Sequence, residues 1–278
     1  MKALFDQSSL KCSKVVTNAY STSFSLGIKM FAPSIRPAIY AIYGFVRYAD
    51  EIVDSFEGYP QKELFDDFVA EYKNSLERKI SLNPIINAFQ EVVHNYELHQ
   101  YALDFLKRME ADLYVTDYQT QEDYENYIYG SADVVGLMCL RVFVNNDNDR
   151  FNALKDSAKY LGSAFQKVNF LRDIKDDFEG LGRSYFPNLS ENTLTDKLKQ
   201  EIIDEIEEDF SKAYQGIVQL PMESRLGVYI AYRYYLGLLK KLKRTKSENI
   251  LNGRIRISNS IKLYILTKSY IRYKFNAI

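Results

Sequence analysis

Glycine and proline are scarce in this sequence. Among 278 residues there are 12 glycines and 6 prolines, and both residue types interrupt helices. A β-sandwich or a Rossmann fold needs more turn residues than this, so the scarcity favours an all-α fold. The hydrophobic and charged fractions, 46% and 26%, are typical of a globular chain, which excludes a disordered or collagen-like protein.

Cysteine is also rare, because Cys12 and Cys139 are the only two and form no C-x-x-C pair. Two thiols in a chain of this length indicate a reducing compartment rather than a disulfide scaffold. The N-terminal stretch lacks the apolar core of a secretory signal. The sequence also contains no run of 18 apolar residues, the length needed to cross a bilayer. We therefore expect a cytoplasmic protein, and the net charge of −1 predicts no affinity for nucleic acid.

Positive charge is concentrated near the C terminus. Residues 240–278 carry 11 lysines and arginines and one acidic residue, a net charge of +10 against −11 for the rest of the chain. Basic residues interleaved with Ile, Leu, Tyr and Phe could lie on the anionic surface of the inner membrane or face anionic ligands. They fit a solvated helix packed on an acidic body equally well, so both interpretations stay open. The oligomeric state is not predicted.

Apolar residues recur with a helical period along most of the chain. We predict helices over 38–55, 61–79, 84–96, 99–114, 122–144, 150–178, 195–219, 222–246 and 256–273. The strongest strand candidate, 141–144, fits better as the end of a helix, and 180–192 must be a loop. No repeat or linker divides the chain. We therefore expect one domain over 1–278, a large helical bundle with room for an interior cavity.

An acidic cluster lies near the end of the first predicted helix. In RYADEIVD, Arg47, Asp50 and Asp54 share one helix face because residues three and four apart are neighbours, and Glu51 stands beside them. A solvated helix face would explain these charges. However, the preceding AIYAIYGFV reads as buried on nearly all sides, and charges on a buried helix are costly unless they serve an ion or a partner.

A second acidic cluster ends a later predicted helix. In NFLRDIKDDFEG, Asp173 and Asp177 repeat the i, i+4 spacing, with Asp176 next to the second and Arg172 before the first. Upstream, Asn169 and Gln166 extend the same polar face by one and two turns. Two clusters of matching spacing, each beside an arginine, are stronger evidence for a functional site than one cluster.

The residue types also indicate the ligand. The two histidines, His94 and His99, miss the i, i+4 zinc spacing, and no thiolate cluster exists, so zinc, copper and iron are disfavoured. A di-iron bundle needs repeated Glu-x-x-His motifs, which are absent. Oxygen ligands favour Mg²⁺, with Mn²⁺ as a possible substitute. The nearby Arg47, Arg172 and Arg183 are suited to binding phosphate oxygens.

Five segments, in order along the chain, resemble the squalene/phytoene synthase family of head-to-head prenyltransferases, most of all its bacterial, Bacteroidetes-type phytoene synthases. They are STSF at 21–24, the stretch 36–54, YIYGSADVVGLM at 127–138, LGSAFQKVNFLRDIKDDFEGLGRSYFP at 161–187, and RIRISNSIKL near the C terminus. The string Q-x-x-N-x-x-R-D-x-x-x-D with R-x-Y-x-P is highly specific. Two positions depart from the family pattern: Glu51 replaces a second aspartate, and Tyr20 replaces a histidine.

The resemblance implies an isoprenoid-synthase-type helical bundle with a central hydrophobic cavity and two Asp-rich helices facing each other at its mouth. It implies that two geranylgeranyl diphosphates condense to phytoene through prephytoene diphosphate, with loss of two diphosphates, a step of carotenoid biosynthesis. One alternative is a squalene or dehydrosqualene synthase acting on farnesyl diphosphate. Another is a non-catalytic helical assembly factor of the same fold, which the two intact Asp pairs disfavour.

The resemblance also assigns roles to single residues. The catalytic residues it implies are Asp50, Asp54, Asp173, Asp177, Tyr43, Arg47 and Arg172. The metal ligands would be Asp50, Glu51, Asp54, Asp173, Asp176 and Asp177. The substrate would contact Ser21, Ser23, Phe24, Tyr127, Ala132, Val135, Gly136, Gln166, Asn169, Arg183 and Tyr185. For Arg254, Arg256 and Lys262 we favour plain surface charge over contact with diphosphate.

Overall fold

The structure, a computed structural model, describes residues 1–115, 118, 120–187, 189, 194–275 and 278. Within these ranges the chain forms helices and no β-sheet, which confirms the predicted all-α class. The elements are α1 (Lys2–Tyr20), α2 (Thr22–Ile28), α3 (Arg36–Ser55), α4 (Gln61–Arg78), α5 (Pro84–Tyr96), α6 (His99–Asp112), α7 (Gln121–Ile128), the π-helical turn η1 (Tyr129–Asp133), α8 (Val134–Phe143), α9 (Asn148–Leu181), α10 (Asp196–Ile217), α11 (Met222–Arg244), α12 (Ser247–Ile250) and α13 (Asn259–Lys274).

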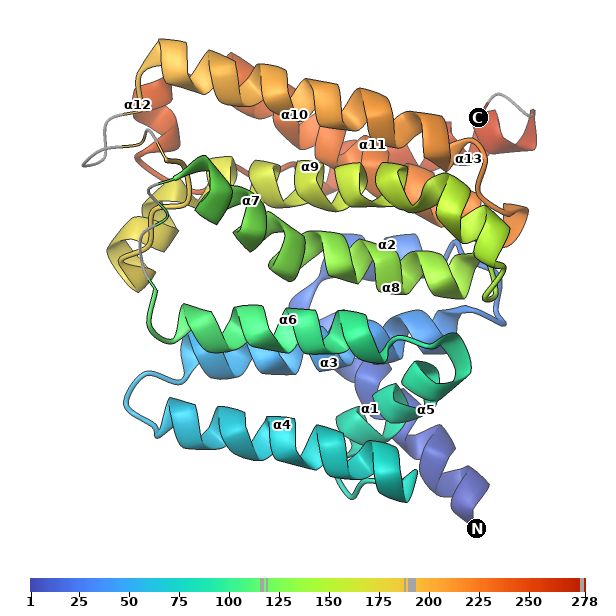
Figure 1. The fold of residues 1–278 in the computed structure, drawn as a ribbon. Coiled ribbons are helices and arrows are strands. Elements are labelled where there is room, and N and C mark those ends of the chain that lie inside the picture. Colours follow the sequence, from blue (N-terminus) through green and yellow to red (C-terminus); the bar gives the residue numbers. More distant parts are fainter. Residues whose placement is uncertain (116–117, 119, 188, 190–193, 276–277) are drawn as a thin grey trace.

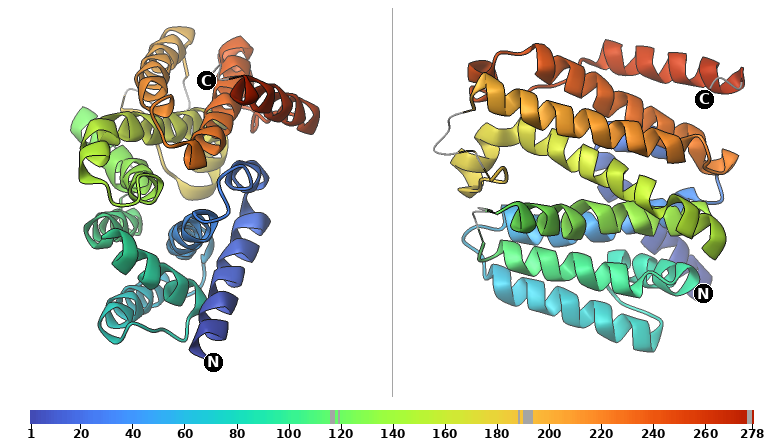
Figure 2. Two further views of the ribbon diagram at one scale, coloured as in Figure 1. Left: turned by 90° about the vertical axis from the view of Figure 1, so that its right-hand side faces the viewer. Right: turned by 45° about the horizontal axis from the view of Figure 1, so that its top comes forward.

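Most of the long helices run side by side along one direction, with α4 at one edge of the bundle and α13 at the opposite edge (Figures 1 and 2). The 34-residue α9 lies in the middle and packs against α8, α10 and α11. On the other side of the bundle, α3 packs against α1, α5 and α6. None of the described helices has the length and apolar character that crossing a membrane requires.

Short polar side chains set several helix starts. The Ser21 hydroxyl accepts a hydrogen bond of 3.1 Å from the Phe24 N–H at the start of α2. Asn83 caps α5 in the same way and is followed by Pro84, whose fixed φ suits the first turn. Asp147 caps α9, and Thr195 caps α10. At the other end of α9, Gly182 takes a left-handed φ of +61°, which ends the helix.

The nine predicted helices are confirmed to within three residues at each end, except that 122–144 is divided by η1. The stretch 141–144 is helical up to Phe143, as expected. Of the predicted loop 180–192, residues 180–181 belong to α9, and residues 188 and 190–192 lie outside the described residues. The sequence predicts no helix before residue 38, whereas the structure has α1 and α2 there.

The helix α1 was missed because its buried face is not apolar. Ser9, Ser13 and Thr17 are fully buried, and only Val16 among its buried residues is a hydrocarbon side chain. The hydroxyls of Ser9, Ser13 and Thr17 donate to backbone carbonyls four residues earlier within the helix. A hydrophobic period therefore does not form, although the spacing of the buried residues is helical.

Candidate active site

An apolar cavity lies among α2, α3, α8, α9, α10 and α11. Its α9 wall follows one helix face from Leu154 to Asn169, and its α8 wall continues the π-helical turn η1. This confirms the predicted central cavity. Six of the residues predicted to contact substrate line it, namely Phe24, Ala132, Val135, Gly136, Gln166 and Asn169, and so does Tyr43, which is predicted to be catalytic.

Two glycines in the wall allow close packing of helices. A Cβ atom added at Gly136 would lie 2.9 Å from the carbonyl oxygen of Ala158, and one added at Gly162 would lie 2.8 Å from that of Ala132. Both distances are too short for a side chain, so α9 packs directly on η1 and α8. Small residues here therefore serve packing and at the same time line the cavity.

The first acidic row lies on α3, one turn beyond the cavity-lining Tyr43 and Val46. The Arg47 guanidinium donates to Asp50 over 2.5 Å and also pairs with Glu51. The guanidinium carbon of Arg47 stands 4.4 Å from the centre of the Tyr20 ring, a geometry that stabilises a cation. In the protein without ligands, Arg47 thus neutralises much of this row.

The second acidic row lies on α9, one turn beyond the cavity-lining Asn169. The Nε atom of Arg172 donates to Asp173 over 2.8 Å. The Nε atom of Arg254 lies 3.0 Å from Oδ1 of Asp173, the same oxygen that accepts from Arg172. Arg254 is exposed, as expected of a surface charge, but it also pairs with the second row, because the chain after α12 folds back and brings it to Asp173. Arg256 is exposed, and Lys262 is half-buried.

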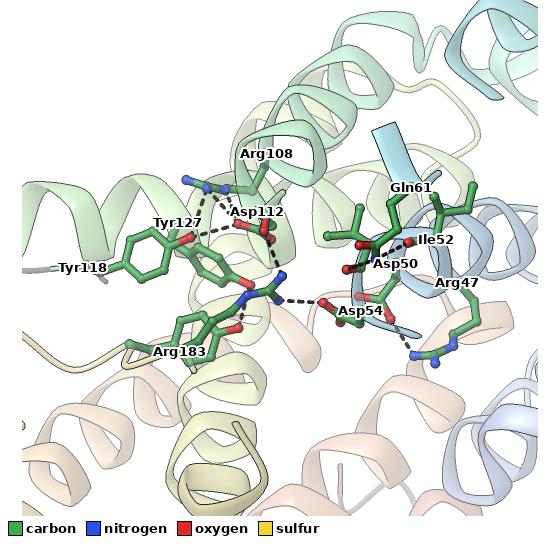
Figure 3. A network of polar contacts seen from close by, with 12 residues as sticks. Arg47, Asp50, Ile52, Asp54, Gln61, Arg108, Asp112, Tyr118, Tyr127 and Arg183 are labelled. Atoms are coloured by element: carbon green, nitrogen blue, oxygen red, sulfur yellow. Dashed lines mark hydrogen bonds and ion pairs between the residues drawn. The ribbon is translucent and has the colours of Figure 1, made fainter. Parts of the chain in front are cut away.

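Arg183 joins the chain just after α9 to the first acidic row (Figure 3). It follows the end of α9, is 5% exposed, and donates to Asp54 over 2.6 Å and to the backbone carbonyl of Asp112 over 2.9 Å. Asp112, at the end of α6, in turn accepts hydrogen bonds from Arg108 and from the Tyr118 hydroxyl. A residue of the α9 end is thus held against the last turns of α3 and α6.

Two carboxyl groups in these rows are hard to ionise. Burial, followed by the charge of Asp54, raises the pKa of Asp50 to about 7. Burial, followed by the charges of Asp173 and Asp54, raises the pKa of Asp177 to about 7. Because Asp54 belongs to α3 and Asp177 to α9, the two rows repel each other across the site. The free protein therefore holds more negative charge here than its arginines balance.

The donor chemistry suits a hard divalent cation, since the side chains that face one another are carboxylates. Among the described residues, no group of three or more His, Cys, Asp or Glu side chains is close enough to hold one metal ion. Mg²⁺ is usually bound by one or two carboxylates together with substrate phosphates. The two acidic rows fit this mode of binding, in which phosphate oxygens complete the coordination of the metal ion. Among the described residues, the rows alone do not supply a complete set of ligands.

A family model described as squalene/phytoene synthase matches residues 17–260. The chain belongs to the squalene/phytoene synthase family. It is 29% identical to the 15-cis-phytoene synthase of Enterobacter agglomerans, over 82% of this chain and 84% of that one. It is also 29% identical to the 15-cis-phytoene synthase of Synechocystis sp., over 92% and 83%. A solved dehydrosqualene synthase structure superposes with a TM-score of 0.81 at 21% identity, over 97% and 98%, which shows the same fold.

Besides the paired carboxylates and arginines described above, five more residues to which the family resemblance gives a role lie outside the cavity wall. Tyr127 and Tyr185 are buried in an aromatic cluster with Phe170, where their hydroxyls are 3.4 Å apart. Ser21 caps α2, and Ser23 is half-buried nearby. Asp176 is exposed. For all five, contact with substrate or metal stays a prediction.

Sequence reasoning missed three side chains around this site of the squalene/phytoene synthase fold. Tyr235 of α11 lines the cavity, stacks on Phe165 at 3.9 Å, and donates to Asn169 over 3.3 Å. Arg108 and Asp112 of α6 support Arg183. Asp112 is four residues from Arg108, a spacing the sequence displays, but nothing local indicates that α6 ends beside α3.

Proposed function

We propose that this protein condenses two molecules of geranylgeranyl diphosphate head to head into phytoene, releasing two diphosphates and two protons. One observation carries the proposal: the aspartate rows of α3 and α9 meet where the apolar cavity ends, joined by the bond from Arg183 to Asp54. The relatives named as 15-cis-phytoene synthases support it over most of the chain.

The charged end of the site is suited to a diphosphate leaving group. Diphosphate departs readily only when its charge is neutralised. A Mg²⁺ ion held there would act as the Lewis acid. The residues that would hold it are Asp50, Glu51, Asp54, Asp173, Asp176 and Asp177. The guanidiniums that now pair with these rows, those of Arg47, Arg172, Arg183 and Arg254, would donate to phosphate oxygens instead.

The apolar end of the site is suited to the cation that remains. An allylic carbocation must be kept from water until the second prenyl chain reacts with it, and a cavity with mostly apolar walls does this. At the boundary between the two ends, the Phe24 and Tyr43 rings are 5.2 Å apart and both line the cavity. Their faces would stabilise positive charge. The final step loses a proton, so no reductant is required, whereas squalene formation would consume a hydride.

The test is incubation of the purified protein with Mg²⁺ and geranylgeranyl diphosphate, followed by chromatography of the lipid extract. We expect phytoene, without need for NADPH. Asp54→Asn and Asp173→Asn should each lower the rate by about 100-fold or more, since each removes a charge from the diphosphate end. Asp149→Asn, an exposed position at the start of the same α9, is the matched control and should be fully active.

Two results would contradict the proposal. Turnover of farnesyl diphosphate alone would make this a squalene or dehydrosqualene synthase instead. A wild-type protein inactive on every prenyl diphosphate, or Asp54→Asn and Asp173→Asn variants with full activity, would point to the non-catalytic assembly factor.

We also propose that α13 lies on an anionic lipid surface, as at the inner face of a bacterial membrane. The helix packs on α11 through Ile265 and Ser269. Its outer face exposes large apolar side chains within the basic C-terminal segment, namely Leu263, Tyr264, Ile271 and Phe275. An apolar face combined with positive charge is typical of interfacial helices.

Co-sedimentation with vesicles tests this second proposal. Binding should require anionic lipid and weaken as salt is added. Leu263→Ser should reduce it, whereas Leu82→Ser, which changes a still more exposed leucine far from α13, should not. Binding that is indifferent to lipid charge, or equal for the two variants, would refute the docking of α13.

A further inference from the structure

The length of the cavity can be compared with the length of a prenyl chain. Its α9 wall runs from Asn169 to Leu154, and at about 1.5 Å per residue these fifteen steps span about 22 Å. The residues between them recur every three or four positions, so the wall is one continuous helix face. Asp173 lies one turn beyond Asn169, which fixes the diphosphate end and makes Leu154 the far end.

Three apolar side chains close the far end. Leu154 of α9 and Leu220, in the turn between α10 and α11, are 5% and 6% exposed. Phe143, at the end of α8, packs against Phe31 with the two ring centres 5.1 Å apart. The turn that carries Leu220 is fixed, because the Arg225 guanidinium donates twice to the Leu220 carbonyl, over 2.9 and 2.8 Å.

At Leu154 and Leu220, a single layer of side chains separates the cavity from the outside of the protein. Leu154 and Leu220 also line an open groove on the outside of the protein, together with Arg150, Met222 and Arg225. The same two side chains therefore face the cavity on one side and the groove on the other. Shortening either of them would extend the cavity toward the surface.

We propose that Leu154 and Leu220 form the floor of the prenyl site and limit the tail it accepts to four isoprene units. This inference rests on the proposed function. Extended carbon chains advance about 5 Å per isoprene unit, from C–C bonds of about 1.5 Å. Four units need about 20 Å and fill the cavity to the floor. Three units leave the last turn of α9 uncovered, and five units collide with Leu154.

The first experiment makes the floor lower. Wild type, Leu154→Ala and Leu220→Ala are each given equal amounts of the four-unit and five-unit diphosphates, and the product ratio is measured by chromatography. We expect both variants to raise the ratio of five-unit to four-unit product by about tenfold or more, since apolar pockets discriminate at least that much per added group. Leu106→Ala is the control, because Leu106 is equally buried, in α6, and does not line the cavity.

The second experiment makes the floor higher. Ala158 lines the cavity one turn above Leu154. A phenylalanine there should shorten the cavity by about one turn, roughly 5 Å. Ala158→Phe should therefore shift preference from the four-unit to the three-unit diphosphate by about tenfold or more.

The outcomes separate the two proposals. A wild type that makes no product from any prenyl diphosphate would refute the proposed function itself. A wild type active on the four-unit substrate, with Leu154→Ala and Leu220→Ala ratios no different from that of Leu106→Ala, would refute the floor alone. If the two alanine variants do not fold, an unchanged preference in Ala158→Phe would also refute it.

Discussion

Replacing Asp133 with asparagine should stabilise the protein at neutral pH and have little effect at pH 4. Asp133 ends the π-helical turn η1, is 8% exposed, and its Oδ1 atom has no hydrogen-bond partner among the described residues. Burial raises its pKa to about 7, although Lys159 and Lys167 attract its charge and Asp209 repels it. The native state therefore resists ionisation of this carboxyl group.

The size and sign of the effect follow from the two pKa values. In the unfolded chain an aspartate titrates near 3.9, so between about pH 4 and pH 7 the native protein holds a proton that the unfolded chain has released. The free energy of unfolding then falls as pH rises, by about 1.4 kcal/mol per pH unit. Over this window the loss reaches about 4 kcal/mol as an upper bound, and a neutral asparagine removes it.

Urea unfolding of wild type and Asp133→Asn, followed by circular dichroism from pH 4 to pH 8, measures this difference. We expect the stability advantage of the variant to grow with pH and to level off above pH 7. Asp149→Asn, at an exposed position of α9, should show no such trend. An advantage that is constant across the pH range, or a variant that is less stable at pH 8, would show that Asp133 is not held protonated.

Two further predictions concern other charges. Lys167→Met should cost about 3–5 kcal/mol of stability, measured by urea unfolding, because it leaves the buried Asp209, now 2.7 Å from Lys167, without its cation; an unchanged midpoint would contradict this. Removing divalent cations with a chelator should abolish prenyl transfer while the helical circular dichroism stays unchanged. Added Mg²⁺ should restore the activity, and full activity in the chelator would rule out the metal role of the aspartate rows.

The elements that the sequence predicts are those whose signals are local. The helix of α5 follows from Asn83 and Pro84 at its start and from an apolar period along its length. Both aspartate rows are visible because their members are three or four residues apart on one helix. The cavity is predicted only in outline, because a resemblance gives a fold but not the side chains that close it.

The contacts that the sequence does not predict join residues far apart in the chain. Arg183 and Asp54 are separated by 129 positions, and no pattern within either segment indicates that the end of α9 meets the end of α3. The same holds for Leu154 and Leu220, whose proximity depends on how α10 turns into α11. Such contacts depend on helix packing, which the sequence determines but which leaves no local pattern in it.

The residues next to Arg254 in the sequence do not reveal its ion-pair partner. It lies in the most basic part of the chain, where further positive charge looks like a solvated surface, and its side chain is indeed 41% exposed. Yet its Nε atom lies 3.0 Å from Oδ1 of Asp173, the oxygen to which the Nε of Arg172 also donates. An exposed cation gains little from an exposed partner, but Asp173 is 15% exposed and adjoins Asp177, where negative charge is in excess. The basic C-terminal segment therefore serves two surfaces, since Arg254 faces the acidic site while α13 faces outward.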